Sequence, residues 1–113
     1  MHLVDTASSG GPQFYVEHLR VPSMSVGTAV LGVGAVDSQQ PHTEDEIYVV
    51  LRGRARLWTP SLTVDVAPGS VAFVPASEEH RFVDVVDELH VLVVFAPAEY
   101  GNATGQLLRD PST

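Results

Sequence analysis

One stretch of this chain decides how it folds: Gln40-Pro41-His42-Thr43-Glu44-Asp45-Glu46-Ile47-Tyr48-Val49-Val50-Leu51-Arg52-Gly53. It places His42 and Glu46 four residues apart, directly before a run of β-branched and aromatic residues typical of a strand. A second histidine, His80, closes another patterned segment, residues 69–80. Two histidines and one carboxylate are a ligand set that leaves coordination positions of a metal ion open. The residues therefore favour a metal site.

The order of residues along this stretch indicates which side chains share a face. Successive side chains of a strand point to opposite faces, so Glu46, Tyr48 and Val50 are expected on one face. In an extended chain His42 and Gln40 project to the same side. A carboxylate at one end of an otherwise apolar interior is costly unless it is paired or bound to a cation. This pattern supports a cation site near the start of the strand.

A simpler interpretation exists for each part of the pattern. Acidic runs such as 44–46 are usually solvated loops, and His80 alone could be an exposed loop histidine. His90 lies within an expected strand and is interpreted as a half-buried histidine with a partner rather than a ligand. The joint occurrence of His42, Glu46 and His80 within a framework of glycines and prolines favours the metal site.

Length and charge limit the classes of protein. A chain of 113 residues forms one domain with a single core. The apolar fraction of 44% and the charged fraction of 18% are typical of a soluble globular protein and not of a disordered chain. The net charge of -8 argues against binding to nucleic acid or to anionic membrane surfaces. No transmembrane run or signal peptide is visible, so a cytoplasmic location is expected.

Two residue types are missing from the chain, and their absence excludes several chemistries. Without cysteine there can be no disulfides, thiolate metal sites or cysteine nucleophile. Without lysine there can be no Schiff-base catalysis and no lysine-bound pyridoxal phosphate. A metal is prominent among the routes to catalysis that remain.

The rest of the chain reads as an all-β domain. Short β-branched runs alternate with Gly, Pro, Asp and Ser turn signals, which is typical of a sandwich or barrel. About eight strands in two antiparallel sheets would form a jelly roll. The expected strands are Phe14–Val21, Ser25–Val33, Glu46–Leu51, Ala55–Trp58, Leu62–Val66, Ser70–Val74, His80–Val85 and Leu89–Phe95.

The domain boundaries follow from this pattern. Residues 1–13, which include Ser8-Ser9-Gly10-Gly11-Pro12, are expected to form a flexible segment. Residues 14–96 are expected to form the barrel. Residues 97–113 form a tail that could cover the barrel, make a dimer contact or fray.

Two motifs in the sequence resemble those of the cupin superfamily. Gly34-x5-Gln40-x-His42-x3-Glu46-x6-Gly53 is similar to the first cupin motif, and Gly69-x5-Pro75-x-Ser77-x2-His80-x3-Asp84 to the second. The resemblance is close from residue 34 to residue 84, and the strand pattern extends it over residues 14–95. It implies a cupin-type jelly-roll β-barrel and, position by position, His42, Glu46 and His80 as metal ligands.

The chain departs from the family pattern at three positions. Gln40 stands where the family usually has its first histidine ligand, Ser77 replaces a glycine, and Asp84 replaces an asparagine. Ser and Asp suit turn positions nearly as well. Gln40 could coordinate the metal as a fourth contact, hydrogen-bond a water on the metal, or orient a substrate. Tyr48 shares the parity of Glu46 and is a further candidate for a substrate or water contact.

The expected function is that of a metal-binding protein that acts on a small organic molecule. The ligand set is compatible with one divalent ion of Fe, Mn, Ni, Co or Zn. Dioxygenase chemistry is the first hypothesis. A non-oxidative lyase, isomerase or polyketide cyclase is the second, and a small-molecule-binding module without turnover is the third. The resemblance also implies a homodimer.

Overall fold

The computed structural model describes residues 1–6, 15–37 and 41–100. Residues 7–13 of the expected N-terminal segment, Phe14, Gln40 and the expected tail beyond Tyr100 lie outside these ranges. The strands are β1 (Tyr15–Val21), β2 (Met24–Leu31), β3 (Asp45–Trp58), β4 (Thr63–Val66), β5 (Val71–Val74) and β6 (Arg81–Ala96). The expected all-β jelly roll is thus confirmed. No helix that could span a membrane occurs in the described ranges.

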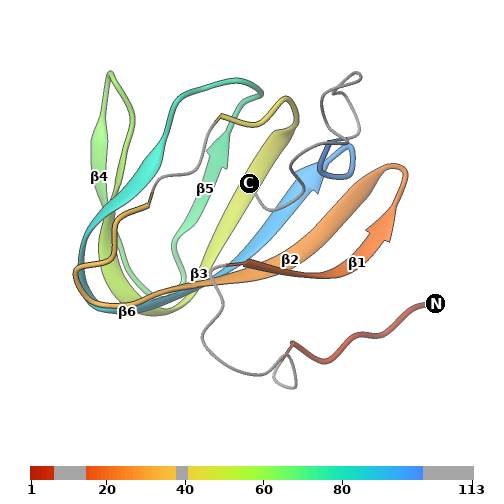
Figure 1. Cartoon of the computed structure of the whole chain (residues 1–113), viewed down its shortest axis with the longest axis horizontal. Helices are drawn as coiled ribbons and strands as arrows, with labels where there is room; N and C mark the ends of the chain where they lie inside the picture. The colour runs from red at the N-terminus through yellow and green to blue at the C-terminus, as the bar shows by residue number, and fades with distance from the viewer. Residues whose placement is uncertain (7–14, 38–40, 101–113) are drawn as a thin grey trace.

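Two long antiparallel strands, β3 and β6, organise the sheet. Their register runs from Asp45 opposite Ala96 to Trp58 opposite Arg81. The hydrogen-bonded order is β1-β2-β6-β3-β4, and β5 pairs with the first half of β3. Figure 1 shows β1 and β2 at one side of the molecule and β4 at the other, with the curled sheet between them. The first half of β3 therefore pairs with the last residues of β6.

The described residues form six strands because each long strand replaces two of the expected ones. The turn signal Arg52-Gly53-Arg54 lies inside β3, and the break expected between Val85 and Leu89 lies inside β6. At both places the strands bend instead of ending, and the β3–β6 register shifts between Val50 and Arg56. Extra residues in a ladder bend a strand and increase its local twist. The glycine thus marks a bend in a continuous strand.

The interior face of the barrel is the one that the strand parity predicts. Glu46, Tyr48 and Val50 are buried, whereas Ile47 and Leu51 are exposed. The core consists of the inward side chains of β2, β3 and β6 together with one or two from each short strand. Burying such side chains contributes about 1.5–3 kcal/mol each, so this face accounts for most of the stabilisation of the barrel.

Gly53 is required at the bend of β3. Its φ angle is +90°, in the region that side-chain-bearing residues rarely adopt. A Cβ atom at this position would overlap the backbone carbonyl of Glu88 and the Cα atom of Leu89 in β6. The absence of a side chain thus permits the close approach of the two bent strands.

We predict that Gly53→Ala lowers the free energy of unfolding by more than about 3 kcal/mol, because backbone strain and backbone overlap add. Gly69→Ala is the matched control, since Gly69 has a φ of +94° but open space around the missing Cβ. It should cost only about 1 kcal/mol from strain. Urea unfolding of both variants measures the difference. Equal losses would contradict the steric role of Gly53.

Candidate metal centre

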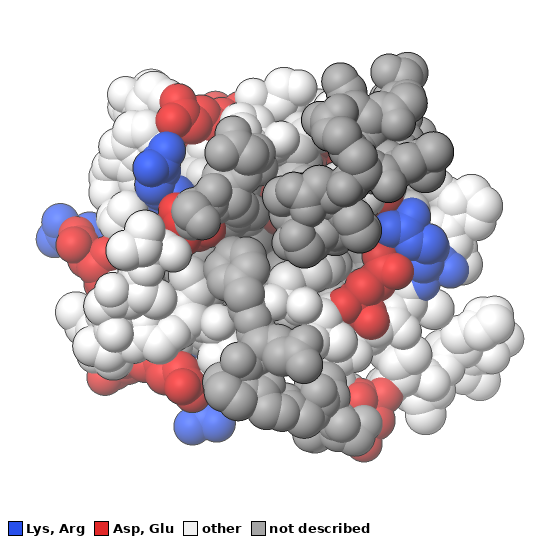
Figure 2. All heavy atoms as spheres, in the orientation of Figure 1, with Lys and Arg blue, Asp and Glu red and all other residues white. Residues whose placement is uncertain are grey.

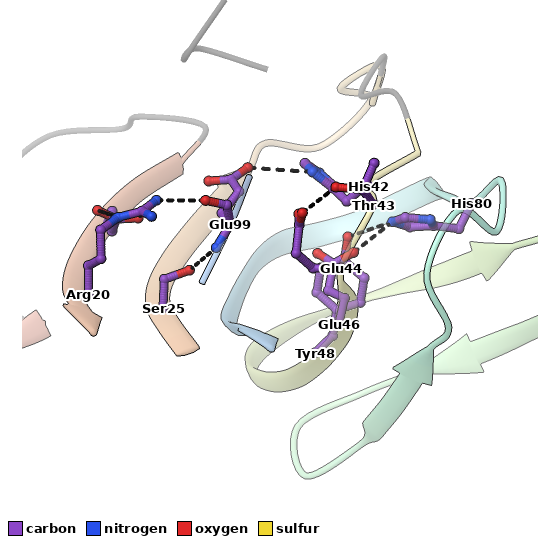
Figure 3. Close-up of polar contacts among 10 residues, drawn as sticks. Arg20, Ser25, His42, Thr43, Glu44, Glu46, Tyr48, His80 and Glu99 are labelled. Atoms are coloured by element: carbon purple, nitrogen blue, oxygen red, sulfur yellow. Dashed lines mark hydrogen bonds and ion pairs between the residues drawn. The ribbon is translucent and has the colours of Figure 1, made fainter. Parts of the chain in front are cut away.

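A buried cluster of three polar side chains lies inside the barrel near the start of β3. Nε2 of His80 lies 3.1 Å from Oε1 of Glu46 and 3.0 Å from the hydroxyl of Tyr48. The contact with Glu46 is an ion-pair contact that does not meet the geometry of a hydrogen bond, and Oε1 accepts none from the described residues. Figure 3 shows the ring of His80 directed at Glu46 and Tyr48.

The backbone around His80 fixes this arrangement. Nδ1 of His80 lies 2.8 Å from the carbonyl oxygen of Glu78, to which it donates. Burial opposes the charged imidazolium, but the Glu46 carboxylate and the Glu78 carbonyl outweigh it, and the pKa of His80 is raised. With Nδ1 committed to the backbone, Nε2 is the nitrogen that faces the interior.

Two backbone contacts join the loops that carry the histidines. The amide of Ser77 donates to the carbonyl of His42 at 2.6 Å, and the amide of Ala76 donates to Oδ1 of Asp45 at 2.9 Å. Ser77 has a φ of +67°, as its position in place of a family glycine implies. The loop before β6 is therefore tied to the loop before β3, which brings the two sequence motifs together.

His42 is buried but faces a different partner. Its ring packs against Phe95, with 4.7 Å between the ring centroids. Its Nδ1 lies 3.5 Å from Oε2 of Glu99. Burial lowers the pKa of His42, so the neutral imidazole is favoured. Neutral imidazole is the form that binds a metal ion.

Glu99 enters the barrel from the segment that follows β6. Three main-chain contacts hold residues 98 and 99 against the β1–β2 hairpin. The amide of Glu99 donates to Oγ of Ser25 at 2.8 Å, Arg20 donates to the carbonyl of Glu99 at 3.0 Å, and the amide of Ala98 donates to the carbonyl of Pro22 at 3.4 Å. Burial, followed by repulsion from Glu17 and other carboxylates, raises the pKa of Glu99 to about 8.

A small cavity connects His42, Glu46, Tyr48 and Glu99. It is lined by these four and Tyr15, and by apolar side chains of β2 and β6. The space open to the centres of water-sized molecules is about 20 Å³, room for roughly one water or one ion. The described residues thus leave room for an ion beside the polar side chains of the cavity.

The buried side chains carry more acidic than basic groups. Asp37, Glu44, Glu46 and Glu99 are buried, and the only buried basic groups in the described ranges are two histidines. No described arginine is buried, and arginines are visible on the surface in Figure 2. The chain has no lysine. Buried carboxylates must be paired, protonated or bound to a cation. The interior therefore has a deficit of positive charge.

The structure brings the predicted residues together only in part. Glu46, His80 and Tyr48 form one cluster, while His42 lies at the same cavity but turns Nδ1 to Glu99. Within the described residues, no group of three His, Asp or Glu side chains is already closed around a cation position. The alternative of a solvated acidic loop is wrong for the glutamates at both ends of the 44–46 run, since both are buried.

Three residues of the site were missed by the sequence analysis. Glu44 shares the parity of Glu46, and this signal could have indicated its burial. Its carboxylate accepts a short hydrogen bond from Thr43. Glu99 and Tyr15 come from distant parts of the chain, and no spacing in the sequence relates them to His42. His90 has the partner expected of it, Glu88, at 2.8 Å.

Comparisons with known proteins agree with this barrel. The model of the cupin domain family matches residues 27–96. An uncharacterised protein of Streptomyces coelicolor is 47% identical over 85 residues, which cover 75% of this chain and 81% of that protein. A cupin family protein of Methanocaldococcus jannaschii with a double-stranded β-helix fold superimposes with a TM-score of 0.73 at 14% identity, over 86% of this chain and 91% of that one.

The DMSP lyase DddQ of Ruegeria pomeroyi also superimposes, with a TM-score of 0.64 at 21% identity, over 67% of this chain and 39% of that chain. The likeness to these two structures concerns the fold alone. The curled antiparallel barrel with paired polar motifs at one end defines a double-stranded β-helix protein. The family match then identifies it further: the chain belongs to the cupin family.

We predict that Tyr48→Phe lowers the free energy of unfolding by about 1 kcal/mol, because it removes the hydroxyl next to Nε2 of His80. Tyr15→Phe is the matched control at the same cavity. The Tyr15 hydroxyl is buried without a hydrogen-bond partner among the described residues, so its loss should leave stability unchanged or raise it. Thermal and urea unfolding test the pair, and a larger loss in Tyr15→Phe would refute the assignment.

Proposed function

We propose that this protein is a metal-dependent enzyme acting on a small organic molecule, with one divalent cation held by His42, Glu46 and His80. The observation that carries the proposal is the deficit of positive charge inside the barrel. Among the described residues four carboxylates are buried but only two basic side chains, both histidines, and Oε1 of Glu46 has no hydrogen-bond donor among them. A bound cation would offset both.

The donor atoms fit a divalent ion. Imidazole nitrogens and a carboxylate suit Fe, Mn, Co, Ni and Zn, and their identity alone does not choose among these. Nε2 of His80 and Oε1 of Glu46 already lie 3.1 Å apart, close enough to share one ion. Gln40 occupies the motif position of a further ligand and is proposed as the fourth contact.

When bound, such an ion would polarise a carbonyl or enolate oxygen, or bind substrate and dioxygen side by side. The residues of this chain supply the rest. The apolar side chains of β2 and β6 limit the water that can enter the cavity. The Tyr48 hydroxyl lies 3.0 Å from Nε2 of His80, and with a cation on that nitrogen it would be available to orient a substrate oxygen or to hold a proton.

Dioxygenase chemistry remains the first candidate, because two histidines and one carboxylate leave adjacent coordination positions open. The non-oxidative alternative is a lyase, isomerase or cyclase. It is favoured by the Tyr48 hydroxyl, a group that can hold a proton beside the ligand set. The fold shared with DMSP lyase DddQ is compatible with this alternative.

The metal content of protein purified without added metal separates these functions. Stoichiometric iron together with substrate-dependent oxygen uptake is the expected result for the dioxygenase. Zinc, with turnover unchanged under anaerobic conditions, would support the non-oxidative enzyme instead. A bound metal without turnover on phenolic, enolic or carbonyl substrates would leave a binding module. No metal uptake from iron, manganese, cobalt, nickel or zinc would refute the proposal.

We predict that His42→Ala and Glu46→Gln each weaken binding of Mn²⁺ or Zn²⁺ by more than about 100-fold, beyond the range for groups that only support a ligand. Gln40→Ala should weaken binding less than His42→Ala. His90→Ala is the matched control, since its ring pairs with Glu88 outside the site. Calorimetric titration measures the affinities, and circular dichroism checks folding. An unchanged affinity in Glu46→Gln would exclude this carboxylate as a ligand.

A further inference from the structure

We propose that Glu99 is a positioning residue of the site, which holds the His42 ring at Nδ1 and so presents Nε2 as the metal-binding nitrogen. The inference deepens the proposed function and rests on it for the role of Nε2. Its geometric part, the control of the His42 ring by Glu99, stands independently. The observation that carries it is the delivery of a buried carboxylate to Nδ1 by an anchored segment outside both sequence motifs.

Contacts to the main chain of residues 98 and 99 fix the position of Glu99. Ser25, Arg20 and Pro22 bind the main chain of residues 98 and 99, which leaves the side chain of Glu99 to point inward (Figure 3). Only 5% of the residue is exposed. A glutamate at the end of a strand would normally extend into water, because burial of a carboxylate is costly. Here three contacts hold it inside.

The contact between Glu99 and Nδ1 of His42 affects which nitrogen of the imidazole ring carries the proton. When the Glu99 carboxylate is ionised it can only accept a hydrogen bond, so the tautomer of His42 with its proton on Nδ1 is the one that this carboxylate favours. The lone pair is then on Nε2, on the other side of the ring. A carboxylate or carbonyl at the second ring nitrogen commonly fixes a metal-binding histidine in this way. His80 already has such a partner in the carbonyl of Glu78, 2.8 Å from its Nδ1, and Glu99, 3.5 Å from Nδ1 of His42, is the group in position to do the same for His42.

Nitrogen NMR of the histidine rings tests the geometric part in the metal-free protein. The measurement is made near pH 9, above the raised pKa of Glu99, about 8. His42 should carry its proton on Nδ1 in the wild type and change to a mixture of tautomers in Glu99→Ala. His80 should be unaffected. A wild-type His42 with its proton on Nε2, or one that Glu99→Ala leaves unchanged, would overturn the proposal.

Calorimetric titration with Zn²⁺ then tests the link to the metal. Glu99→Ala should weaken binding by about 10–100-fold, and Glu99→Gln by less, because the amide oxygen can still accept from Nδ1. The matched control is Glu88→Ala, which removes the same kind of carboxylate–histidine contact at His90. It should leave the affinity unchanged. Equal losses in Glu99→Ala and Glu88→Ala would refute a specific role.

The two parts can fail separately. If no variant and no wild-type protein binds any metal, the proposed function falls, while the tautomer of His42 still tests the contact with Glu99. If metal binds with unchanged affinity in Glu99→Ala, the positioning role falls while the metal site stands. Ser25→Ala provides a further variant. It loosens the anchor without removing the carboxylate, and it should shift the His42 signals in the same direction as Glu99→Ala, by less.

Discussion

The site depends on the bend that β3 and β6 share. Glu46 lies near the start of β3, whereas His80 precedes the start of β6, which pairs with the far end of β3. In a flat sheet these two residues would lie some ten residues apart along the strands. The close approach of Gly53 to Glu88 curls both strands, so that inward side chains from opposite ends of the pair meet inside one barrel. The strand pairing therefore provides both the core and the site.

Local rules of the sequence were sufficient for the parts of this structure that depend on local geometry. Strand parity predicted the inward face of Glu46, Tyr48 and Val50. Turn chemistry predicted that serine suits the turn position of a family glycine, and Ser77 adopts a φ of +67° there. The number of strands depended on something else. Whether Gly53 ends a strand or bends it is decided by the partner strand, because the hydrogen bonds of β6 continue past the bend.

In the candidate site, too, some residues could be predicted from local sequence and others depend on contacts between distant parts of the chain. His42, Glu46 and His80 could be selected from the spacing of two motifs, because each motif places its residues on one loop and strand. Glu99 could not be selected, since 57 positions separate it from His42 and its approach depends on anchors in the β1–β2 hairpin. The orientation of the His42 ring could not be predicted from the sequence either. A ring has two nitrogens, and only its neighbours in space decide which one faces the interior.

The cost of burying charge connects stability with function in this barrel. The apolar interior that holds β3 and β6 together is also the medium in which carboxylates resist ionisation, and the raised pKa of Glu99 expresses this cost. The chain has no lysine, and no described arginine is buried. The negative charge of a buried carboxylate can then be neutralised by a proton or by a bound metal ion. The Glu46 carboxylate raises the pKa of His80, which favours a proton on the imidazole beside it. A cation bound at the same atoms, as proposed above, would replace that proton and offset the same buried charge.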